Sequence, residues 1–543
     1  MGNSTRQPGR GMSRRRFLQH AGAGVAAAPL LACGSSSIPL APGESGAAPR
    51  RFRHGVASGD PGSDRVMCWT RVSDVEADTP VTLRLFSDPE LSNPVASFPG
   101  TARATRDFTV KIDADGLEPG TTYYYRFEAA GETSATGRTR TAPLGGIERL
   151  RFGVVSCSSY AHGHFNAYRR LAERADVDAI LHLGDYIYEY GTGEYGDVRP
   201  YQPDHEMVTL EDYRTRHAWY KQDPDLMELH RQFPFITTWD DHESTDNSWR
   251  DGAVNHTEGA EGVWTQRKAW AQQAYDEWMP IRYPETGRVD KIFRSFRYGD
   301  LAEIFVLDTR LYDRDEPDGI PASSVAAEPD RRMLGPEQMN WLLAGLGSSS
   351  ARWKIVAQQM VFMQWQVTAD PSGSGNATYL NGDAWDGYQA ERAQIHAHLR
   401  DNALDNVVIL SGDVHSSWVG DIVENPSNPL AYNPATGAGS LATEFTTTSI
   451  TSPFAIQVPD GEDAFRAANP HIRYVDTIDW GYLLLDLDTA RAQGEYWYVD
   501  TITEPGGGER FETAYAVESG TNTLSQLPVP ASEPPADPPP LAP

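Results

Sequence analysis

Cysteine and basic side chains are scarce in this sequence of 543 residues. Three cysteines are too few for the disulfide framework that stabilises small secreted proteins. Lysine and arginine total 47 against 75 aspartates and glutamates, and the net charge of -28 argues against a nucleic-acid-binding protein, because phosphate backbones are bound by an excess of basic side chains. Hydrophobic residues make up 39% of the chain, which is enough for a large core and more than one domain.

The N-terminus has the features of a twin-arginine export signal. Residues 13–18 read SRRRFL, and a stretch of small and apolar residues follows up to Ala32. This stretch is too short to span a bilayer permanently, and the absence of acidic residues before Glu44 disfavours the alternative of an amphipathic helix. We therefore predict a signal peptide at residues 1–32, recognised by the twin-arginine translocase, and a periplasmic, extracellular or membrane-anchored protein.

The three cysteines have different predicted roles. Residues 30–33 resemble a lipobox, in which Cys33 would become an acylated anchor, although ordinary cleavage a little downstream also fits the sequence. Cys68 lies in the alternating run RVMCWTRV and is predicted to be a small core residue. Cys157 follows an apolar run and is a candidate metal ligand.

Two folded regions are predicted from the periodicity of apolar residues. Residues 50–143 contain alternating runs such as TPVTLRLF and TTYYYRFEAA between turn clusters, which indicates a small N-terminal β-sandwich of the fibronectin type. Residues 149–515 alternate between buried-strand runs and helical stretches, which is typical of an α/β domain. Residues 522–543 form a proline-rich tail, predicted to be extended and disordered.

Four predicted strands of the α/β domain end in groups that can bind metal ions. Because reactive loops of α/β sheets lie beyond the carboxyl ends of the strands, we expect these groups to meet at one edge. Any one of them alone is more often a turn, a solvated loop or a core residue; their recurrence predicts a metal centre. The four segments are VVSC (residues 154–157), LGDYIY (183–188), TWDDHE (238–243) and LSGDVH (410–415).

Phosphoester hydrolysis explains why such groups would converge. Two neighbouring cations that share a carboxylate can hold the phosphoryl oxygens and acidify water. Asp185 suits the shared position, because Gly184 before it lets the backbone approach the cluster closely. Tyr188 can supply a phenolate and Cys157 a thiolate, ligands that favour a strongly Lewis-acidic ion such as ferric iron.

The other two strand ends offer oxygen and imidazole ligands. Asp241 is a candidate ligand of a second cation, and His242 can contact the phosphate or protonate the leaving oxygen. Asp413 and His415 either face the same way on a strand or address neighbouring cations from a loop. Asp240 is either a ligand or a hydrogen-bonding partner of one.

Other polar residues near these motifs receive different predictions. His182 lies inside the ILHLGD run, where a buried histidine with satisfied hydrogen bonds is the better interpretation. The segments 190–219 and 366–385 are candidate lids over the metal edge.

The ordered set of motifs resembles the PhoD-type alkaline phosphatase and phospholipase D family, a branch of the calcineurin-like metallophosphoesterases. The match covers nearly all of residues 50–500, and the set is specific although each motif alone is not. The motifs are HGVASGDP (residues 54–61), WTRV (69–72), SC (156–157), GDYIY (184–188), DYR (212–214), WDDHE (239–243), LDTR (307–310), SGDVH (411–415) and EFTTTSITSP (444–453).

The resemblance implies an αββα metallophosphoesterase sandwich, preceded by the N-terminal β-sandwich, and export by the twin-arginine route. It implies an iron and calcium centre that acts on phosphate monoesters and diesters. The residues that would bind Fe3+ are Cys157, Asp185, Tyr188 and His415. Those that would bind Ca2+ are Asp240 or Asp241, Asp413 and the shared Asp185.

The resemblance also implies roles for residues that are not metal ligands. His242 matches the phosphate-facing histidine of related phosphoesterases. Arg214 is the candidate for stabilising charge in the transition state, and Arg216 is the alternative. The family often has asparagines after DDHE, whereas here STDNSW leaves Asn247 as the nearby amide.

We therefore expect an exported, metal-dependent alkaline phosphatase or phosphodiesterase. One alternative is a phospholipase D-type phosphodiesterase that acts on phospholipids. Another is a surface metal-binding protein with the same fold but no turnover, since fold alone does not determine function.

Overall fold

The computed structural model describes residues 50–372, 377–454 and 461–543. From Arg50 onwards these residues form one compact unit. The predicted signal peptide and Cys33 lie outside the described residues. Within the described ranges, no helix combines the length and the apolar character needed to cross a membrane.

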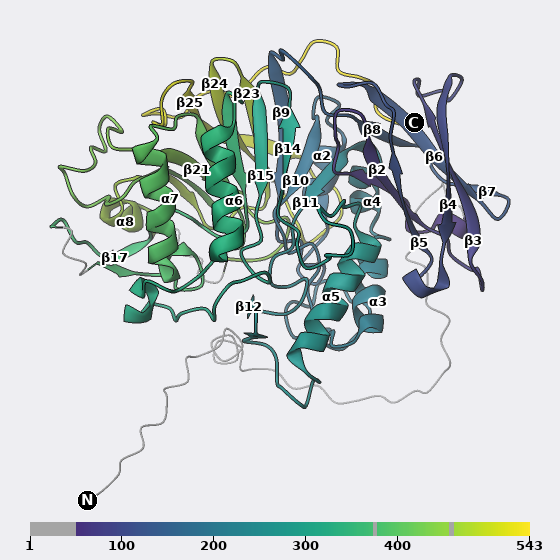
Figure 1. Ribbon diagram of the computed structural model, residues 1–543, viewed down its shortest axis with the longest axis horizontal. Coiled ribbons are helices and arrows are strands. Elements are labelled where there is room, and N and C mark those ends of the chain that lie inside the picture. Colours follow the sequence, from purple (N-terminus) through teal and green to yellow (C-terminus); the bar gives the residue numbers. More distant parts are fainter. Residues whose placement is uncertain (1–49, 373–376, 455–460) are drawn as a thin grey trace, which may run out of the picture. The chain divides into compact units, whose positions relative to one another are not determined.

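Two β-sheets face each other at the centre of this unit (Figure 1). The first has the strand order β25-β24-β23-β9-β10-β11-β1-β2-β5, and the second has the order β14-β15-β16-β19-β21-β20-β22. The first sheet contains β1 (Val56–Gly59), β2 (Val66–Arg71), β5 (Thr109–Ala114), β9 (Arg149–Val155), β10 (Ala179–His182), β11 (Pro234–Thr237), β23 (Gly481–Asp488), β24 (Arg491–Val499) and β25 (Glu509–Glu518). The second contains β14 (Arg294–Tyr298), β15 (Ala302–Val306), β16 (Trp353–Ala357), β19 (Val407–Ser411), β20 (Ser417–Ile422), β21 (Ala442–Thr446) and β22 (Ile472–Asp476).

Alternation of side chains along the central strands creates three apolar layers. In β9, Val154 points into the layer between the sheets, whereas Val155 points into the outer layer on the other face. In β19, Val408 lies in the layer between the sheets and Ile409 in the outer layer beyond the second sheet. Both faces of these strands are buried, which explains why their sequences read as continuous apolar runs.

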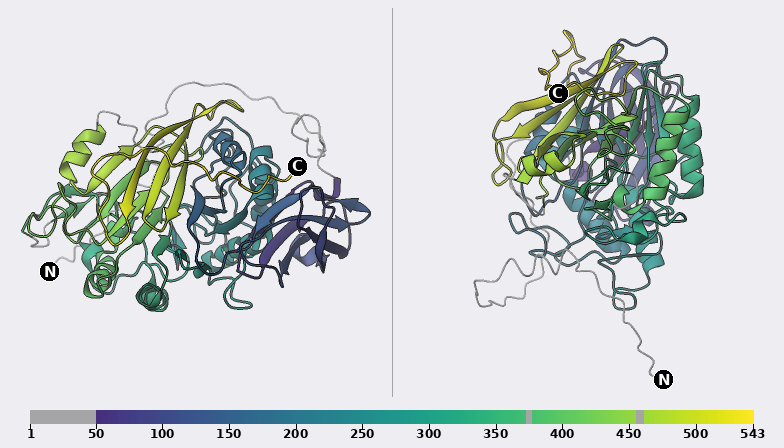
Figure 2. Two further views of the ribbon diagram at one scale, coloured as in Figure 1. Left: turned by 90° about the horizontal axis from the view of Figure 1, so that it is seen from above. Right: turned by 90° about the vertical axis from the view of Figure 1, so that its left-hand side faces the viewer.

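Helices cover the outer faces of both sheets. Beside the second sheet, α6 (Gly335–Ser348) and α7 (Gln389–Asp401) lie next to each other (Figure 1), on the side opposite to β23–β25 (Figure 2). The first sheet is covered by α2 (Asn166–Ala172), α3 (Leu210–Tyr220), α4 (Pro224–Gln232) and α5 (Trp264–Trp278). This αββα arrangement agrees with the predicted mixed α/β fold.

Several short elements complete the described fold. The helix α8 (Gly461–Ala468) packs near β22. Local hydrogen bonds set the starts of α3 and α4: Thr209 and Asp212 form a capping box for α3, and Asp223 caps α4 with Pro224 at its first position. The remaining elements are η1 (Arg50–Phe52), η2 (Ala104–Arg106), β12 (Ser248–Trp249), β13 (Gly252–Ala253), η3 (Ser324–Ala327), β17 (Gln366–Thr368), β18 (Thr378–Tyr379) and η4 (Trp385–Gly387).

The N-terminal strands form two facing layers, but one layer is continuous with the large sheet. Cys68, Leu83 and Phe127 share one core between β2 and the further sheet, so Cys68 lies where the core interpretation places it. Parallel pairing of β1 with β11, Ser58 opposite Pro234, joins this region to the α/β sheet. The further sheet consists of β3 (Thr79–Phe86), β4 (Pro94–Ala102), β6 (Thr122–Ala129), β7 (Glu132–Thr133) and β8 (Gly137–Arg140).

The proline-rich tail is packed against the protein, so the prediction that it is disordered is wrong. The hydroxyl of Tyr124 donates to the Pro540 carbonyl at 2.6 Å, and the backbone N–H of Ala542 donates to the Gln232 side chain at 2.8 Å. Prolines cannot donate backbone hydrogen bonds, but their carbonyls still accept them. Donors on the folded surface therefore hold the extended tail in place, which composition alone does not reveal.

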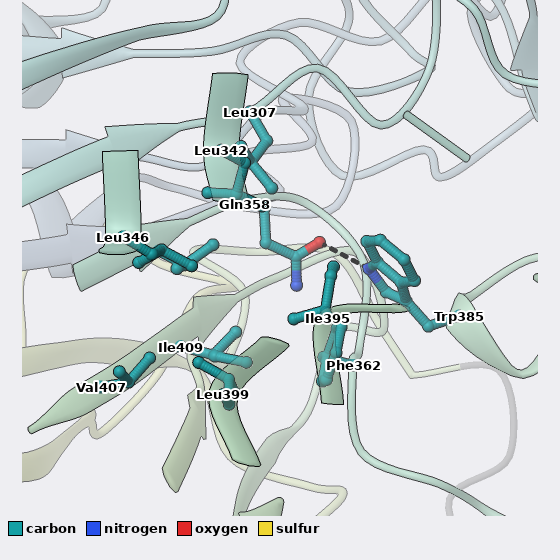
Figure 3. Close-up of a pocket in the computed structure, with 11 residues that line it drawn as sticks. Leu307, Leu342, Leu346, Gln358, Phe362, Trp385, Ile395, Leu399, Val407 and Ile409 are labelled. Atoms are coloured by element: carbon teal, nitrogen blue, oxygen red, sulfur yellow. Dashed lines mark hydrogen bonds between the residues drawn. The ribbon is translucent and has the colours of Figure 1, made fainter. Parts of the chain in front are cut away.

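The outer layer beneath α6 and α7 is closely packed. Figure 3 shows the apolar side chains around a void of about 10 Å³, together with Gln358, whose side-chain oxygen accepts a 3.1 Å hydrogen bond from the Trp385 indole. A void of this size is at the lower limit for one water molecule, so truncation of a side chain here leaves an unfilled cavity.

We predict that Leu346→Ala lowers the free energy of unfolding by about 2–5 kcal/mol, because Leu346 is 1% exposed in this layer. Denaturant titration followed by circular dichroism measures the change. The matched control is Leu430→Ala, since Leu430 is 97% exposed, and its effect should stay within about 0.5 kcal/mol. Equal effects of the two substitutions would contradict this description of the core.

Candidate metal centre

The loops that follow the central strands bring the predicted metal-binding residues together. Cys157 follows β9, Asp185 follows β10, and Asp413 follows β19. The structure forms three groups of donor atoms, and within each group the atoms lie within 4.8 Å of one another. The groups are Cys157, Asp185 and His415; Asp185, Asp241 and His242; and Asp240, Asp241 and Asp413.

Two carboxylates link these three groups into one cluster. Asp185 belongs to the first and second groups, and Asp241 belongs to the second and third. A carboxylate has two oxygens and can therefore contribute to two neighbouring positions. Asp413 and His415 belong to different groups, as expected if the two residues lie in a loop and bind neighbouring cations.

Tyr188 and a suitably oriented histidine complete the group that contains Cys157. The Tyr188 hydroxyl donates to Asp185 Oδ2 at 2.9 Å and lies 3.2 Å from His415 Nε2. His415 Nδ1 lies 2.9 Å from the Pro453 carbonyl, which can only accept, so Nδ1–H donates there and Nε2 faces the cluster. Thiol, carboxylate, phenol and imidazole groups thus meet at one place.

The backbone at these residues has an unusual conformation. Cys157, Asp185, Asp413 and His415 all have positive φ angles, between 55° and 63°. Residues other than glycine rarely adopt this left-handed conformation, and it persists only where the surroundings enforce it. Strained backbone at four of the predicted ligands is typical of a functional site.

Glu243 holds two of the metal loops in place. Its carboxylate accepts hydrogen bonds from the backbone N–H groups of Asp185 at 3.1 Å, Tyr186 at 2.5 Å and Asp240 at 2.7 Å. A Cβ on Gly184 would collide with the backbone and Cβ of Asp240, so glycine is required for this close approach of the loops. Glu243 lies in the WDDHE motif, but the sequence did not reveal this role.

His242 is buried and oriented by an acidic partner. Its Nδ1 lies 2.7 Å from Glu189 Oε2, and its ring stacks on Tyr188 with a centroid distance of 4.2 Å. Although burial opposes the charged form, the carboxylates of Asp241 and Glu189 raise the pKa of His242 well above its usual value. Glu189 follows the GDYIY motif directly, which is the signal that could have identified it.

Arg310, and not Arg214, contacts the acidic part of the cluster. Its guanidinium donates to Asp413 Oδ1 at 2.7 Å, forms an ion pair with Asp240, and lies 3.0 Å from Asp383 Oδ2. Arg310 ends the LDTR motif after β15, and the sequence did not predict a role for this arginine. Asp383 comes from the segment 366–385, which was predicted to be a lid.

Arg214 does not reach the cluster, which corrects its predicted placement. It forms a two-pronged ion pair with Glu277, at 2.6 and 2.7 Å, because α3 packs against α5 at that point. The alternative, Arg216, is buried and donates to backbone carbonyls, including that of Tyr190 at 3.0 Å. His182 is a buried core histidine as predicted: its Nε2 lies 2.9 Å from the Tyr168 hydroxyl.

The residues of the cluster fit metal cations. Burial raises the pKa of Asp240 well above its usual value; Arg310 opposes this, and Asp185, Asp241 and Asp413 add to it. Burial, followed by the charge of Asp185, also raises the pKa values of Cys157 and Tyr188. A bound cation would lower these pKa values again, because it stabilises the anionic forms of the ligands.

Unsatisfied oxygen atoms point to the same conclusion. Asp240 Oδ2 and Asn247 Oδ1 are buried and accept no hydrogen bond from the described residues. The backbone N–H of Asn247 donates to Asp241 Oδ2 at 2.5 Å, so Asn247 is next to the cluster. Buried polar atoms without partners are rare in folded proteins, and an ion is a common explanation.

The sequence and fold are similar to those of known phosphatases. The model of a family described as PhoD-like phosphatase matches residues 152–496, and that of the PhoD-like phosphatase N-terminal domain matches residues 38–143. The chain is 36% identical to alkaline phosphatase D of Bacillus subtilis (strain 168), over 95% of this chain and 89% of that protein.

Two solved structures resemble this one. A structure described as that of PhoD has a TM-score of 0.80 at 34% identity, and the match covers 91% of this chain and 94% of that chain. A purple acid phosphatase from yellow lupin (Lupinus luteus) seeds has a TM-score of 0.56 at 14% identity, covering 87% and 74% of the two chains. The second similarity concerns the fold alone.

We predict that Asp185→Ala loses most of the bound metal, because Asp185 belongs to two of the three donor groups. Asp413→Ala should lose less, since Asp413 belongs to one. Metal content per chain, measured by inductively coupled plasma mass spectrometry after gel filtration, tests this order. The control is Asp463→Ala, whose side chain is 93% exposed, and it should keep all the metal. An Asp185→Ala protein with unchanged metal content would refute the shared position of Asp185.

Proposed function

This chain belongs to the PhoD-like phosphatase family, and we propose that it hydrolyses phosphate esters with metal ions held at the cluster described above. The observation that carries the proposal is the linking of three donor groups through Asp185 and Asp241. Adjacent cation positions with shared carboxylates suit the binding of a phosphoryl group. Hydrolysis of p-nitrophenyl phosphate and of bis-p-nitrophenyl phosphate, each with and without a chelator, tests the activity and separates monoester from diester preference.

We further propose that the cluster holds two kinds of cation. Cys157, Tyr188, Asp185 and His415 offer thiolate, phenolate, carboxylate and imidazole ligands, which suit Fe3+. The group of Asp240, Asp241 and Asp413 offers oxygen ligands alone, which suits Ca2+. When bound, the cations would supply positive charge that polarises the phosphoryl oxygens and acidifies water.

The protein's own groups orient and balance the reaction centre. His242 is positioned to protonate the leaving oxygen, because Glu189 fixes its ring beside Asp185 and Asp241. Arg310 partly neutralises Asp240 and Asp413 and holds their oxygens in place. This role differs from the stabilisation of transition-state charge that was predicted for Arg214.

Export by the twin-arginine route remains part of the proposal. Its support is the sequence of residues 1–32. Fractionation of cells that express the full chain, with and without lysines in place of Arg14 and Arg15, tests the route. Retention of the protein in the cytoplasm of the lysine variant is the expected result.

We predict that His242→Ala keeps most of its metal, because two of the three donor groups do not contain His242. Its kcat should fall by roughly a hundredfold or more, the usual effect of losing a positioned proton donor. The loss should be greater for esters with poor leaving groups, which depend most on protonation. The matched control is His205→Ala, since the His205 side chain is 63% exposed, and its rate should equal that of the wild type. Wild-type rates in His242→Ala would refute the assignment.

We also predict that the purified protein contains iron and shows a visible absorption band from phenolate-to-iron charge transfer. Tyr188→Phe should lose the band, because the Tyr188 oxygen lies among the proposed iron ligands. Tyr312→Phe removes a hydroxyl that donates to Glu337 at the surface, and it should keep the band. A fully active preparation that contains zinc alone would contradict the iron assignment.

A further inference from the structure

Partly exposed aromatic rings lie above the buried reaction centre. Tyr188 and His242 are buried, whereas Tyr190, Tyr195 and His162 are only partly buried. The ring of Tyr195 stacks on that of Tyr188 at 5.5 Å and lies nearly parallel to that of His242 at 6.3 Å. Tyr190 lies 5.0 Å from Tyr195. The rings thus form a continuous layer from the centre towards solvent.

His162 closes this layer from a different loop. Its ring makes an edge contact with Tyr195 at a centroid distance of 4.4 Å, and its Nδ1 lies 2.8 Å from the Ser159 hydroxyl. Burial lowers the pKa of His162 to about 4, so the ring is neutral at ordinary pH. A neutral imidazole against the Tyr195 ring extends the aromatic surface.

The loop that carries Tyr190 and Tyr195 is held firmly in place. The guanidinium of Arg216 donates to the carbonyls of Tyr190 at 3.0 Å and Pro203 at 2.8 Å, at the two ends of the loop. Within the loop, the Arg199 guanidinium pairs with Asp223 at 2.6 Å. Because these anchors are buried or nearly so, the aromatic layer exists before any ligand binds.

We propose that Tyr190, Tyr195 and His162 form a leaving-group subsite for planar aromatic groups, either aryl rings or nucleobases. This inference rests on the proposed function, because it places the phosphoryl group beside His242. The leaving group of an ester held there extends from the buried centre towards solvent, past the rings of Tyr190 and Tyr195. A planar leaving group gains stacking contacts at these rings, whereas a small alkyl group does not.

Binding of non-hydrolysable phosphonates tests the subsite without turnover. We expect the metal-loaded wild type to bind phenylphosphonate about tenfold more tightly than methylphosphonate, as measured by calorimetry. Tyr195→Ala and Tyr195→Leu should lose this preference, and Tyr195→Phe should retain it because the ring face remains. The control Val198→Ala removes a side chain of the same loop that is 43% exposed, and it should behave as the wild type.

Hydrolysis separates the subsite from the proposed function. The ratio of kcat/KM for naphthyl phosphate to that for glycerol phosphate should fall about tenfold in Tyr195→Leu, and each variant is compared at equal metal content. Hydrolysis of both esters with an unchanged ratio, or equal phosphonate affinities in the wild type, would overturn the subsite alone. Absence of hydrolysis in a metal-loaded wild type that still prefers phenylphosphonate would overturn the proposed function and leave the subsite standing.

Discussion

The structure depends on the compensation of negative charge at one end of its two central sheets. Asp185, Asp240, Asp241 and Asp413 are buried together. The Arg310 guanidinium pairs with Asp240, Asp241 and Asp413. Two like charges about 4 Å apart repel by about 4 kcal/mol even at an effective dielectric constant of 20. The cluster therefore carries an excess of carboxylates, which metal cations would offset.

Two buried carboxylates elsewhere in the fold accept hydrogen bonds from backbone N–H groups. Glu391 accepts hydrogen bonds from three consecutive residues that begin with Met333, and Glu444 accepts them from Phe362 and Met363. Burial raises the pKa of Glu444 to about 7 and that of Glu243 to about 8. In each case an acidic side chain organises a loop that has no regular structure of its own. Glu243 organises the metal loops in the same way.

Local sequence patterns predicted the ends of the strands and the candidate metal ligands that follow them, because a strand and the next loop are contiguous in the sequence. Partners joined across the fold were not visible. Arg214 and Arg310 both lie in specific motifs. After folding, Arg214 pairs with Glu277 and Arg310 pairs with Asp240, and neither partner is near in the sequence. The pairing of β1 with β11 and the docking of the tail escaped prediction for the same reason. The period of apolar residues indicated the α/β class, and the family resemblance implied the αββα arrangement, whereas these contacts need the assembled structure.

The strand order of the first sheet sets a condition on when the centre can form during synthesis. Strand β9, which ends just before Cys157, lies between β10, made soon afterwards, and β23, made near the end of the chain. A nascent chain on the ribosome therefore lacks one neighbour of β9 until most of the protein has been translated. Such distant pairings form late in folding. The sheet that carries Cys157 and Asp185 therefore gains its full set of neighbouring strands only after nearly the whole chain has been made.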